Sequence, residues 1–399
     1  MTKKKLNSDE KIIFCKKCVE SNQRYIGSVS FFDMKQSRKQ RTIFDNGICG
    51  ACKYFEYKKD IDWKSREEEL VSILDKYRKK NGDYDVLIPG SGGKDTIYLS
   101  HVLKHKYKMN PLTITWAPHL YTEIGWHNFR AWQEMGFDNE LHTPNPKIHR
   151  KLTKLAFKNL LHPFQPFVLG QHNLAPRLAI EKKIKLIVYG DAYFEKGVGG
   201  NIYGISGIKN NALFSTNNKD LYFGGVHISE LSKHGISKHD IKPYLPLKED
   251  DVENAQLTVV SLPYFLKYNP QENFYFASEY SNFKVNPYRS EGTYTKYSSL
   301  DDKLDNLHFY TWFIKTGRGR ATEDAALEVR NNIINREEAV ALVKKYDGEF
   351  PKKYFKDLLE YLDLSEKNFF EIIDKFRPPH IWEKIKGKWK LRHAVWMNE

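Results

Sequence analysis

The chain has 399 residues, 40% of them hydrophobic and 29% charged, which is typical of a globular protein of two or three domains. Its net charge of +14 favours phosphate-bearing partners, but does not choose among nucleotides, nucleotide sugars, RNA and anionic membranes. No apolar stretch of signal-peptide length follows the basic start, and no run approaches the roughly 20 apolar residues of a membrane span. We therefore expect a cytoplasmic protein without a membrane partner.

The four cysteines form two C-x-x-C pairs near the N-terminus, at Cys15 and Cys18 and at Cys49 and Cys52. Each such turn can place two thiolates on one metal, and two turns complete a tetrahedron. We predict a structural Zn²⁺ site, because four protein ligands leave no position open for water. An iron–sulfur cluster and a redox pair are the alternatives. Metal binding by all four would leave no cysteine to hydrolyse glutamine or to carry sulfur.

A glycine-rich loop follows a short apolar strand in the next part of the chain. Residues 63–80 have the spacing of an amphipathic helix, residues 85–89 read as a strand, and Leu99, Val102 and Leu103 mark another helix. Between strand and helix lies Gly90-Ser-Gly-Gly-Lys-Asp-Thr96. This order points backbone N–H groups and a helix N-terminus at an anion.

The loop fits neither the Walker A pattern nor the dinucleotide fingerprint. It matches in full the S-G-G-x-D-[ST] signature and so resembles the PP-loop ATP pyrophosphatases, which cleave ATP between the α and β phosphates and leave an adenylated substrate oxygen. We predict that ATP binds the backbone and side chains of Ser91, Gly92, Gly93, Lys94, Asp95 and Thr96. Lys94 would add positive charge, and Asp95 would act through Mg²⁺ or orient the loop.

Two later strands are expected in the same sheet, at residues 112–117 and 185–190. The PP-loop resemblance places the adenine near Trp116. Gly190 and Asp191 close the later strand at the edge where parallel sheets bind ligands, so Asp191 is a candidate Mg²⁺ or nucleotide contact, with a surface acid or helix cap as the alternative. The predicted fold is α/β, a PP-loop (adenine nucleotide alpha-hydrolase-like) parallel sheet with helices on both faces.

We divide the chain into three parts. Residues 1–60 form the Cys₄ zinc-binding segment, residues 61–300 form the PP-loop domain with an insertion near 197–260, and residues 301–399 form a helical region. Helical segments are expected after Thr322, near Arg336 and at residues 352–362.

Nearly the whole chain resembles the N-acetyl sugar amidotransferases, a branch of the PP-loop superfamily. Besides the cysteine pairs and the loop, the resemblance includes residues 115–125, 163–167, 290–302 and 319–325. The chain departs from the family at Gly90, where valine is more usual, at Thr96, where serine is, and around Gly190-Asp191.

The resemblance implies that ATP adenylates the acetamido oxygen of a nucleotide-linked sugar and that ammonia then displaces AMP to leave an acetamidino group. Such sugars enter bacterial O-antigen lipopolysaccharide or flagellar glycans. The implied cofactors are ATP, Mg²⁺ and Zn²⁺. Ammonia would come from a partner glutaminase, together with a cyclase-like subunit.

Further candidates lie outside the loop. His119 and Glu123 are candidate bases, and Tyr121 a sugar contact, although a Pro-His turn can also simply cap the next helix. Lys94 and Asp95 complete the predicted catalytic set. Contacts to the sugar or to phosphate are predicted for Gln171, Arg289, Lys296, Arg318 and Arg320, each with a structural role as the alternative.

Two other functions compete with this prediction. A tRNA-modifying PP-loop enzyme would share the loop, the zinc pairs and the basic charge. Sulfur insertion usually needs further cysteines, whereas amine transfer to tRNA does not. A zinc-knuckle RNA-binding module would bind RNA without ATP and with steep salt dependence. We expect a nucleic-acid partner less than a nucleotide sugar.

Overall fold

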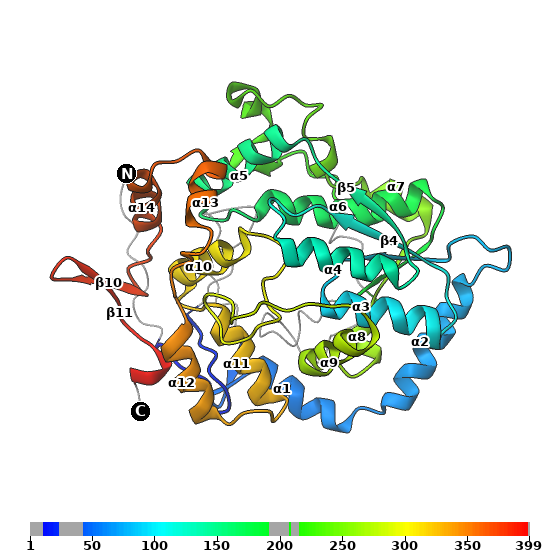
Figure 1. Cartoon of the computed structure of the whole chain (residues 1–399), viewed down its shortest axis with the longest axis horizontal. Helices are drawn as coiled ribbons and strands as arrows, with labels where there is room; N and C mark the ends of the chain where they lie inside the picture. Colours follow the sequence, from blue (N-terminus) through cyan, green and yellow to red (C-terminus); the bar gives the residue numbers. More distant parts are fainter. Residues whose placement is uncertain (1–10, 24–42, 191–206, 209–214, 398–399) are drawn as a thin grey trace.

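The computed structural model describes residues 11–23, 43–190, 207–208 and 215–397. At its centre is a five-stranded sheet in the order β5-β4-β3-β6-β9, in which every neighbouring pair is parallel (Figure 1). The strands are β3 (Val86–Pro89), β4 (Pro111–Trp116), β5 (Asp138–His142), β6 (Leu186–Tyr189) and β9 (Thr258–Ser261). Within the described residues, no helix is both long and apolar enough to cross a membrane.

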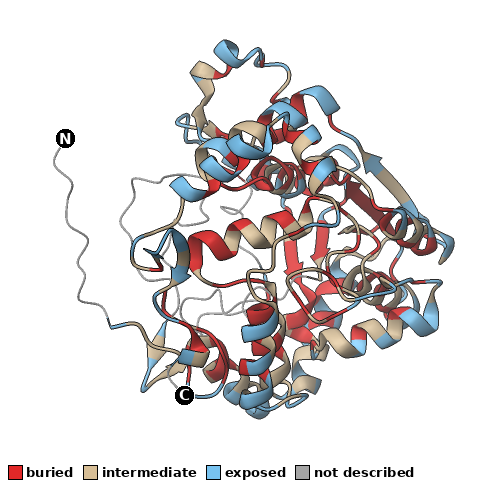
Figure 2. Ribbon diagram, turned by 60° about the vertical axis from the view of Figure 1, so that its left-hand side comes forward, coloured by how far each residue is buried: buried red, intermediate tan, exposed pale blue. Residues whose placement is uncertain are grey.

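Helices cover both faces of this sheet, which confirms the predicted fold class. Side chains alternate between faces along β3: Val86 and Ile88 pack with one set of helices, and Leu87 packs with the other. The first set is α2 (Trp63–Tyr77), α3 (Lys94–His101) and α8 (Leu262–Phe265), and the second is α6 (Gln165–Glu181) and α7 (Glu249–Ala255). Strands β3, β4, β6 and β9 are therefore mostly buried, whereas the edge strand β5 is partly exposed (Figure 2).

Local sequence explains where these helices begin and end. The Asp62 carboxylate accepts hydrogen bonds from the backbone N–H groups of Lys64 and Ser65 and so caps α2. The helix stops at Tyr77, three residues earlier than predicted, because Arg78 is extended. A π-helical turn, η2 (Val102–Lys106), continues α3.

Other elements complete the sheet domain. Three further helices are α4 (Glu123–Glu134), α5 (Pro146–Leu160) and α9 (Pro270–Tyr280). The described part of the predicted insertion holds the hairpin β7 (Tyr222–Phe223) and β8 (Val226–His227) with η5 (Ile228–His234) and η6 (Lys242–Tyr244). Phe223, Leu231 and Tyr244 are buried in the same core as Trp116, so this part packs onto the domain.

The C-terminal region is helical, as predicted, and near its end it contains a hairpin that was not expected. Its elements are α10 (Asp305–Thr316), α11 (Arg320–Arg330), α12 (Arg336–Tyr346), α13 (Phe355–Leu362), α14 (Glu366–Lys375), β10 (Trp382–Ile385), β11 (Lys388–Leu391) and η7 (Val395–Met397). Lys386 and Gly387 both have positive φ, the conformation of a two-residue hairpin turn. In Figure 1 this region lies beside the sheet.

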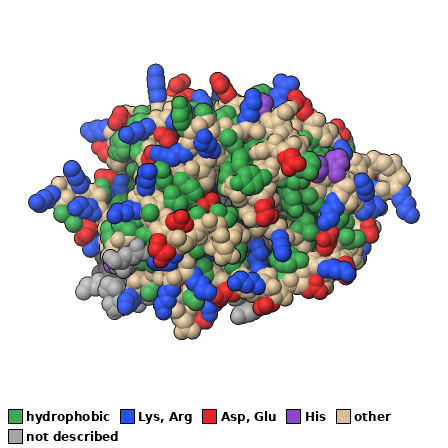
Figure 3. All heavy atoms as spheres, turned by 60° about the horizontal axis from the view of Figure 1, so that its bottom comes forward, with side chains coloured by type: hydrophobic (Ala, Val, Ile, Leu, Met, Phe, Trp, Pro, Cys, Tyr) green, Lys and Arg blue, Asp and Glu red, His purple; other side chains and the backbone are tan. Residues whose placement is uncertain are grey.

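The N-terminal segment packs against that C-terminal region. It contains β1 (Phe44–Asp45), β2 (Ile48–Cys49), α1 (Gly50–Tyr57) and η1 (Lys58–Asp60). The four cysteines share a buried cluster with Ala325 and Ala326 of α11 and with Ala339, Val340 and Val343 of α12. On the face shown in Figure 3, the Lys and Arg side chains are spread among acidic ones.

Candidate active site and metal centre

The glycine-rich loop lies at the point where the strand order of the sheet reverses. From β3 the chain moves outward to β4 and β5, and it then returns to the other side of β3 as β6. The carboxyl ends of the two strands on either side of such a switch point open a crevice that binds ligands. Residues 90–93 leave β3 there, and Gly190 leaves β6: a Cβ on Gly190 would lie 3.5 Å from the carbonyl oxygen of Asp95.

The backbone of the loop requires glycine at one position. Gly92 has φ of +82°, and a Cβ built there would lie 2.7 Å from the carbonyl oxygen of Asn128 and from Cα of Phe129. Gly93 is the N-cap of α3, so Lys94 and Asp95 occupy the first turn of the helix. The uncapped N–H groups of that turn and the positive end of the helix dipole attract an anion.

The side chain of Thr96 occupies the space beside the Cα atom of Gly90. A Cβ on Gly90 would lie 2.1 Å from Cγ2 and 2.6 Å from Oγ1 of Thr96. The γ-methyl group of Thr96 therefore occupies the volume that a side chain at position 90 would need. The two departures from the family pattern at the loop are thus linked: the small residue at position 90 leaves room for the extra methyl group of Thr96.

We expect Gly90→Ala alone to destabilise the protein by about 2 kcal/mol, because the new methyl group overpacks the loop against Thr96. Thr96→Ser alone should cost less than about 1 kcal/mol, and the double variant should recover part of the loss, with a coupling of about 1 kcal/mol. Urea unfolding of the four proteins measures this cycle. Additive effects would contradict the pairing.

The charged side chains of the loop are held by neighbouring helices. Lys94 Nζ lies 2.7 Å from Asp95 Oδ2, and Asn273 of α9 donates a hydrogen bond of 2.8 Å from Nδ2 to Asp95 Oδ1. The Lys94 ammonium lies 5.5 Å from the ring centroid of Tyr297. The side chain of Asp95 is therefore held in place at the start of α3, beside the Lys94 ammonium.

A cavity of about 220 Å³ opens over the loop. Residues 298–301 and Arg320 form its wall opposite the loop, and Asn128 of α4 adds a side chain. A smaller hollow of about 70 Å³ shares Lys94, Asp95, Tyr297, Ser298 and Arg320 with it. The cavity walls thus come from the predicted PP-loop domain and from the beginning of the C-terminal region.

Arg320 is the predicted arginine that reaches this cavity. Its guanidinium bonds Asp324 Oδ1 and Ser298 Oγ, both at 3.1 Å, and lies 4.5 Å from the ring centroid of Phe309. Arg318 points elsewhere, into a buried pair of carboxylates from Glu20 and Glu323. Only Gly319 separates the two arginines, but side chains two positions apart at the start of a helix point in different directions.

Acidic groups near Arg320 carry raised pKa values. Burial raises the pKa of Asp305 to about 7, opposed by the Arg320 charge. Burial and the neighbouring Asp302 also raise the pKa of Asp301, which a hydrogen bond with Ser91 lowers in part. Asp301 therefore links the loop to the C-terminal region.

The other predicted residues lie outside the lining of the loop cavity. Trp116 is buried against His142 and Tyr244. The His119 ring is fully buried, with Nδ1 2.6 Å from Asp302 Oδ2. Tyr121 is half-buried, whereas Glu123, Gln171 and Lys296 are exposed.

Arg289 is held by an acidic partner of its own. It pairs through both terminal nitrogens with Glu349, at 2.6 and 2.7 Å. Asp191 lies outside the described residues.

The sequence prediction missed several residues of the cavity wall. Asn128, Ser298 and Asp301 line the cavity, and Asn273 holds Asp95. The resemblance at residues 290–302 included Ser298 and Asp301, but no local pattern distinguished them. Asn128 and Asn273 carried no signal, since a single asparagine within a helix has no characteristic spacing.

The four cysteines come together as predicted. All four sulfur atoms lie within 4.8 Å of one another, with Cys15 3.8 Å from Cys52 and Cys18 3.7 Å from Cys49. Four sulfurs on one tetrahedral ion, with bonds of about 2.3 Å, stand about 3.8 Å apart. The residues therefore fit a single ion, and they would hold it through four bonds with no open position.

Electrostatics also favours a cation between these thiols. Hydrogen bonds from the other three, that of Cys18 first, lower the pKa of Cys15, whereas burial raises the pKa of Cys18. Interaction with Cys15 raises the pKa values of Cys49 and Cys52. Burial and mutual interaction therefore oppose ionisation of all four thiols together, and a bound cation would offset this cost.

Comparison with known families identifies the C-terminal region. Residues 291–395 match the model "LPS biosynthesis protein WbpG-like, C-terminal domain". This part of the chain is therefore similar to that domain. The match confirms the family resemblance predicted from the sequence. The WbpG-like domain contains Asp301 and Arg320 of the cavity wall, and α11 and α12 against the cysteines.

Two solved structures are similar to the chain. One is a predicted subunit of tRNA methyltransferase from Methanocaldococcus jannaschii, with 15% identity, a TM-score of 0.26, and 53% of this chain and 81% of that chain covered. The other is the U34-tRNA thiolase NcsA from Methanococcus maripaludis with its [4Fe-4S] cluster, with 12% identity, a TM-score of 0.30, and 80% and 90% covered. No curated relative matches the sequence significantly.

Proposed function

We propose that the protein is an ATP-dependent N-acetyl sugar amidotransferase that forms AMP and pyrophosphate. One observation carries the proposal: the S-G-G-x-D-[ST] loop at the switch point and a WbpG-like C-terminal domain line the same cavity, through residues 91–96 on one side and Asp301 and Arg320 on the other. A nucleotide on the loop would thus face a wall supplied by a domain of lipopolysaccharide-biosynthesis proteins.

The loop supplies what ATP activation needs. Backbone N–H groups at residues 91–94 and the start of α3 would hold the phosphates, with Lys94 and Arg320 adding positive charge. Asp95 would act through Mg²⁺, which binds phosphate and carboxylate oxygens and lowers the charge on the leaving pyrophosphate.

In the proposed reaction, the acetamido oxygen of a nucleotide-linked sugar attacks the α-phosphorus, and pyrophosphate leaves. Ammonia then adds to the activated carbon, and AMP departs with the former acetamido oxygen. The product carries an acetamidino group, in which NH replaces O and a proton is released. His119 and Glu123 remain proposed bases for the ammonia step, and Tyr121, Gln171, Arg289 and Lys296 remain proposed substrate contacts. Arg318 was also predicted to contact the substrate, but its buried guanidinium pairs with Glu20 and Glu323 and does not line the loop cavity.

The ammonia is proposed to come from a partner glutaminase, acting with a cyclase-like subunit. All four cysteines of the chain are gathered in one cluster, which we propose holds Zn²⁺. No cysteine is left over as the nucleophile of a cysteine-type glutaminase. The product is proposed to enter a bacterial surface polysaccharide or flagellar glycan, with the protein acting in the cytoplasm.

Purified protein with ATP, Mg²⁺ and ammonium, given either diacetamido nucleotide sugars or bulk tRNA, tests the proposal. We expect AMP and pyrophosphate only when sugar and ammonium are both present, and a product mass in which O is replaced by NH. Release that depends on tRNA would refute the sugar substrate in favour of a tRNA-modifying enzyme. Asp95→Asn serves as the inactive control.

A further inference from the structure

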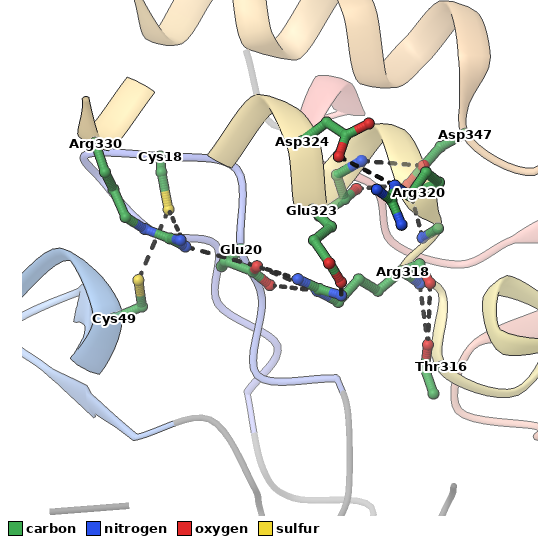
Figure 4. A network of polar contacts seen from close by, with 12 residues as sticks. Cys18, Glu20, Cys49, Thr316, Arg318, Arg320, Glu323, Asp324, Arg330 and Asp347 are labelled. Carbon is green, nitrogen blue, oxygen red and sulfur yellow. Dashed lines mark hydrogen bonds and ion pairs between the residues drawn. The ribbon is translucent and has the colours of Figure 1, made fainter. Parts of the chain in front are cut away.

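A buried chain of charges connects the cysteine cluster with the helix that carries Arg320 (Figure 4). Arg330 Nη2 lies 3.8 Å from Cys18 Sγ and 3.6 Å from Glu20 Oε1. Glu20 in turn accepts hydrogen bonds from Nη2 and Nε of Arg318, at 2.8 and 2.9 Å. Arg318 Nη1 donates to Glu323 Oε2 at 3.0 Å. Charges alternate along this chain, and each has a partner of opposite sign.

These residues are deeply buried, so they hold one another firmly. Glu20 is 1% exposed, Arg318 6% and Arg330 7%. In such surroundings a charge that loses its partner is left without compensation, and the surrounding backbone must move or admit water. The positions of Glu20 and the two arginines are therefore coupled.

Helix α11 spans the distance between the cysteine cluster and the loop cavity. Arg330 is its last residue and Arg320 its first, so the two ends lie roughly 16 Å apart. The first turn is held by Asp347, which accepts from the N–H groups of Gly319 and Thr322 at 3.0 and 3.1 Å. Glu323, in that first turn, ties the beginning of α11 to Arg318 and thereby to Glu20.

A metal changes the charge at one end of this chain. Four thiolates around a divalent ion carry a net charge of −2, and Arg330 is the cation that faces them. An ion bound by the four sulfurs would also fix the position of Cys18 against Arg330, and Arg330 shares Glu20 with Arg318. A change at the metal site would therefore be transmitted through Arg330, Glu20 and Arg318 to the first turn of α11.

We propose that Glu20 and Arg330 are positioning residues that make ATP affinity depend on the metal at the cysteine cluster, through α11 and Arg320. The proposal rests on the proposed ATP site, but not on the identity of the sugar. Coupling between two sites is reciprocal, so bound ATP must tighten metal binding by the same factor by which metal tightens ATP binding.

The experiment uses the metal-loaded full chain and measures metal affinity by competition with a chromophoric chelator, with and without ATP and Mg²⁺. Calorimetry on the same samples gives the dissociation constant of ATP. We expect ATP to tighten metal binding about tenfold in the wild type, within the usual range for coupled sites. In Glu20→Gln this factor should fall to about one, with one metal per chain retained.

Two further variants separate positioning from general destabilisation. Asp357→Asn breaks the Lys303–Asp357 pair, whose 2.7 Å contact lies outside this chain of charges, and should keep the tenfold coupling. Arg330→Lys keeps the positive charge and should retain more coupling than Arg330→Met. A purely structural role for Glu20 would lower both affinities in Glu20→Gln without removing the effect of one ligand on the other.

The outcomes also separate the two proposals. Wild type that binds ATP without any change in metal affinity, or Glu20→Gln with full coupling, overturns the positioning role and leaves the proposed function intact. Wild type that binds no ATP overturns both.

Discussion

Replacing Gly92 with alanine should weaken ATP binding about 100-fold or more, which corresponds to ~3 kcal/mol. The backbone at this residue has φ of +82°, and an alanine Cβ would lie 2.7 Å from backbone atoms of Asn128 and Phe129 in α4. A helix backbone does not yield like a flexible side chain, so the loop must move away from α4. The N–H groups that face the cavity then lose their alignment. Calorimetry with ATP and Mg²⁺ measures the effect.

Gly82→Ala is the matched control for this variant. Gly82 has nearly the same backbone conformation, with φ of +83°, but a Cβ there meets no atom within 4 Å. We expect a loss of about 1 to 2 kcal/mol in stability from the left-handed conformation and unchanged ATP affinity. Equal ATP affinities in Gly92→Ala and Gly82→Ala would show that the contact with α4 does not determine the conformation of the loop.

The second large effect is expected at the cysteine cluster. Cys49→Ser should abolish stoichiometric metal binding and destabilise the protein on the order of 5 kcal/mol, because loss of a structural metal is among the most damaging single changes. The cysteines share one buried cluster with α11 and α12, so the loss should extend beyond the N-terminal segment into the C-terminal region. Hydrogen exchange resolved by segment, together with metal analysis, measures both.

Removal of the metal from the wild type with a chelator should reproduce that pattern of exchange. Acid should also release the metal, since the thiols must lose their protons to bind it, and readdition of Zn²⁺ at neutral pH should restore protection. Retained protection in α11 and α12 of metal-free protein would contradict a structural role for the ion. A visible absorption spectrum with iron in the metal analysis would instead favour the iron–sulfur alternative.

The elements around the loop could be predicted from the sequence because their signals are local. A short apolar run before a glycine cluster predicted β3, and the S-G-G-x-D-[ST] pattern placed the loop correctly before α3. The C-terminal end of helix α2 was less well predicted. Arg78 is a good helix former, but its backbone is in an extended conformation in the structure. The Lys386-Gly387 turn carried a weak hairpin signal within a region of helical periodicity.

The wall of the cavity could not be predicted, because it depends on contacts between distant parts of the chain. Asn273 bonds Asp95 across 178 residues, and Arg318 bonds Glu20 across 298. No periodicity in the sequence distinguishes Arg318, which pairs with Glu20 and Glu323, from Arg320, which lines the loop cavity. That difference follows from where α10 ends and α11 begins, a boundary set by Gly317 in a left-handed conformation.

The packing of the cysteine cluster on α11 and α12 has a consequence for synthesis of the chain. The cysteines leave the ribosome before the helices that cover them, which follow some 300 residues later, roughly 15 to 60 s at ordinary translation rates. Joining segments so far apart also costs roughly 5 kcal/mol of chain entropy. A nascent or truncated chain would therefore present its thiols to solvent and to oxidants, and early metal capture would protect them before the fold closes.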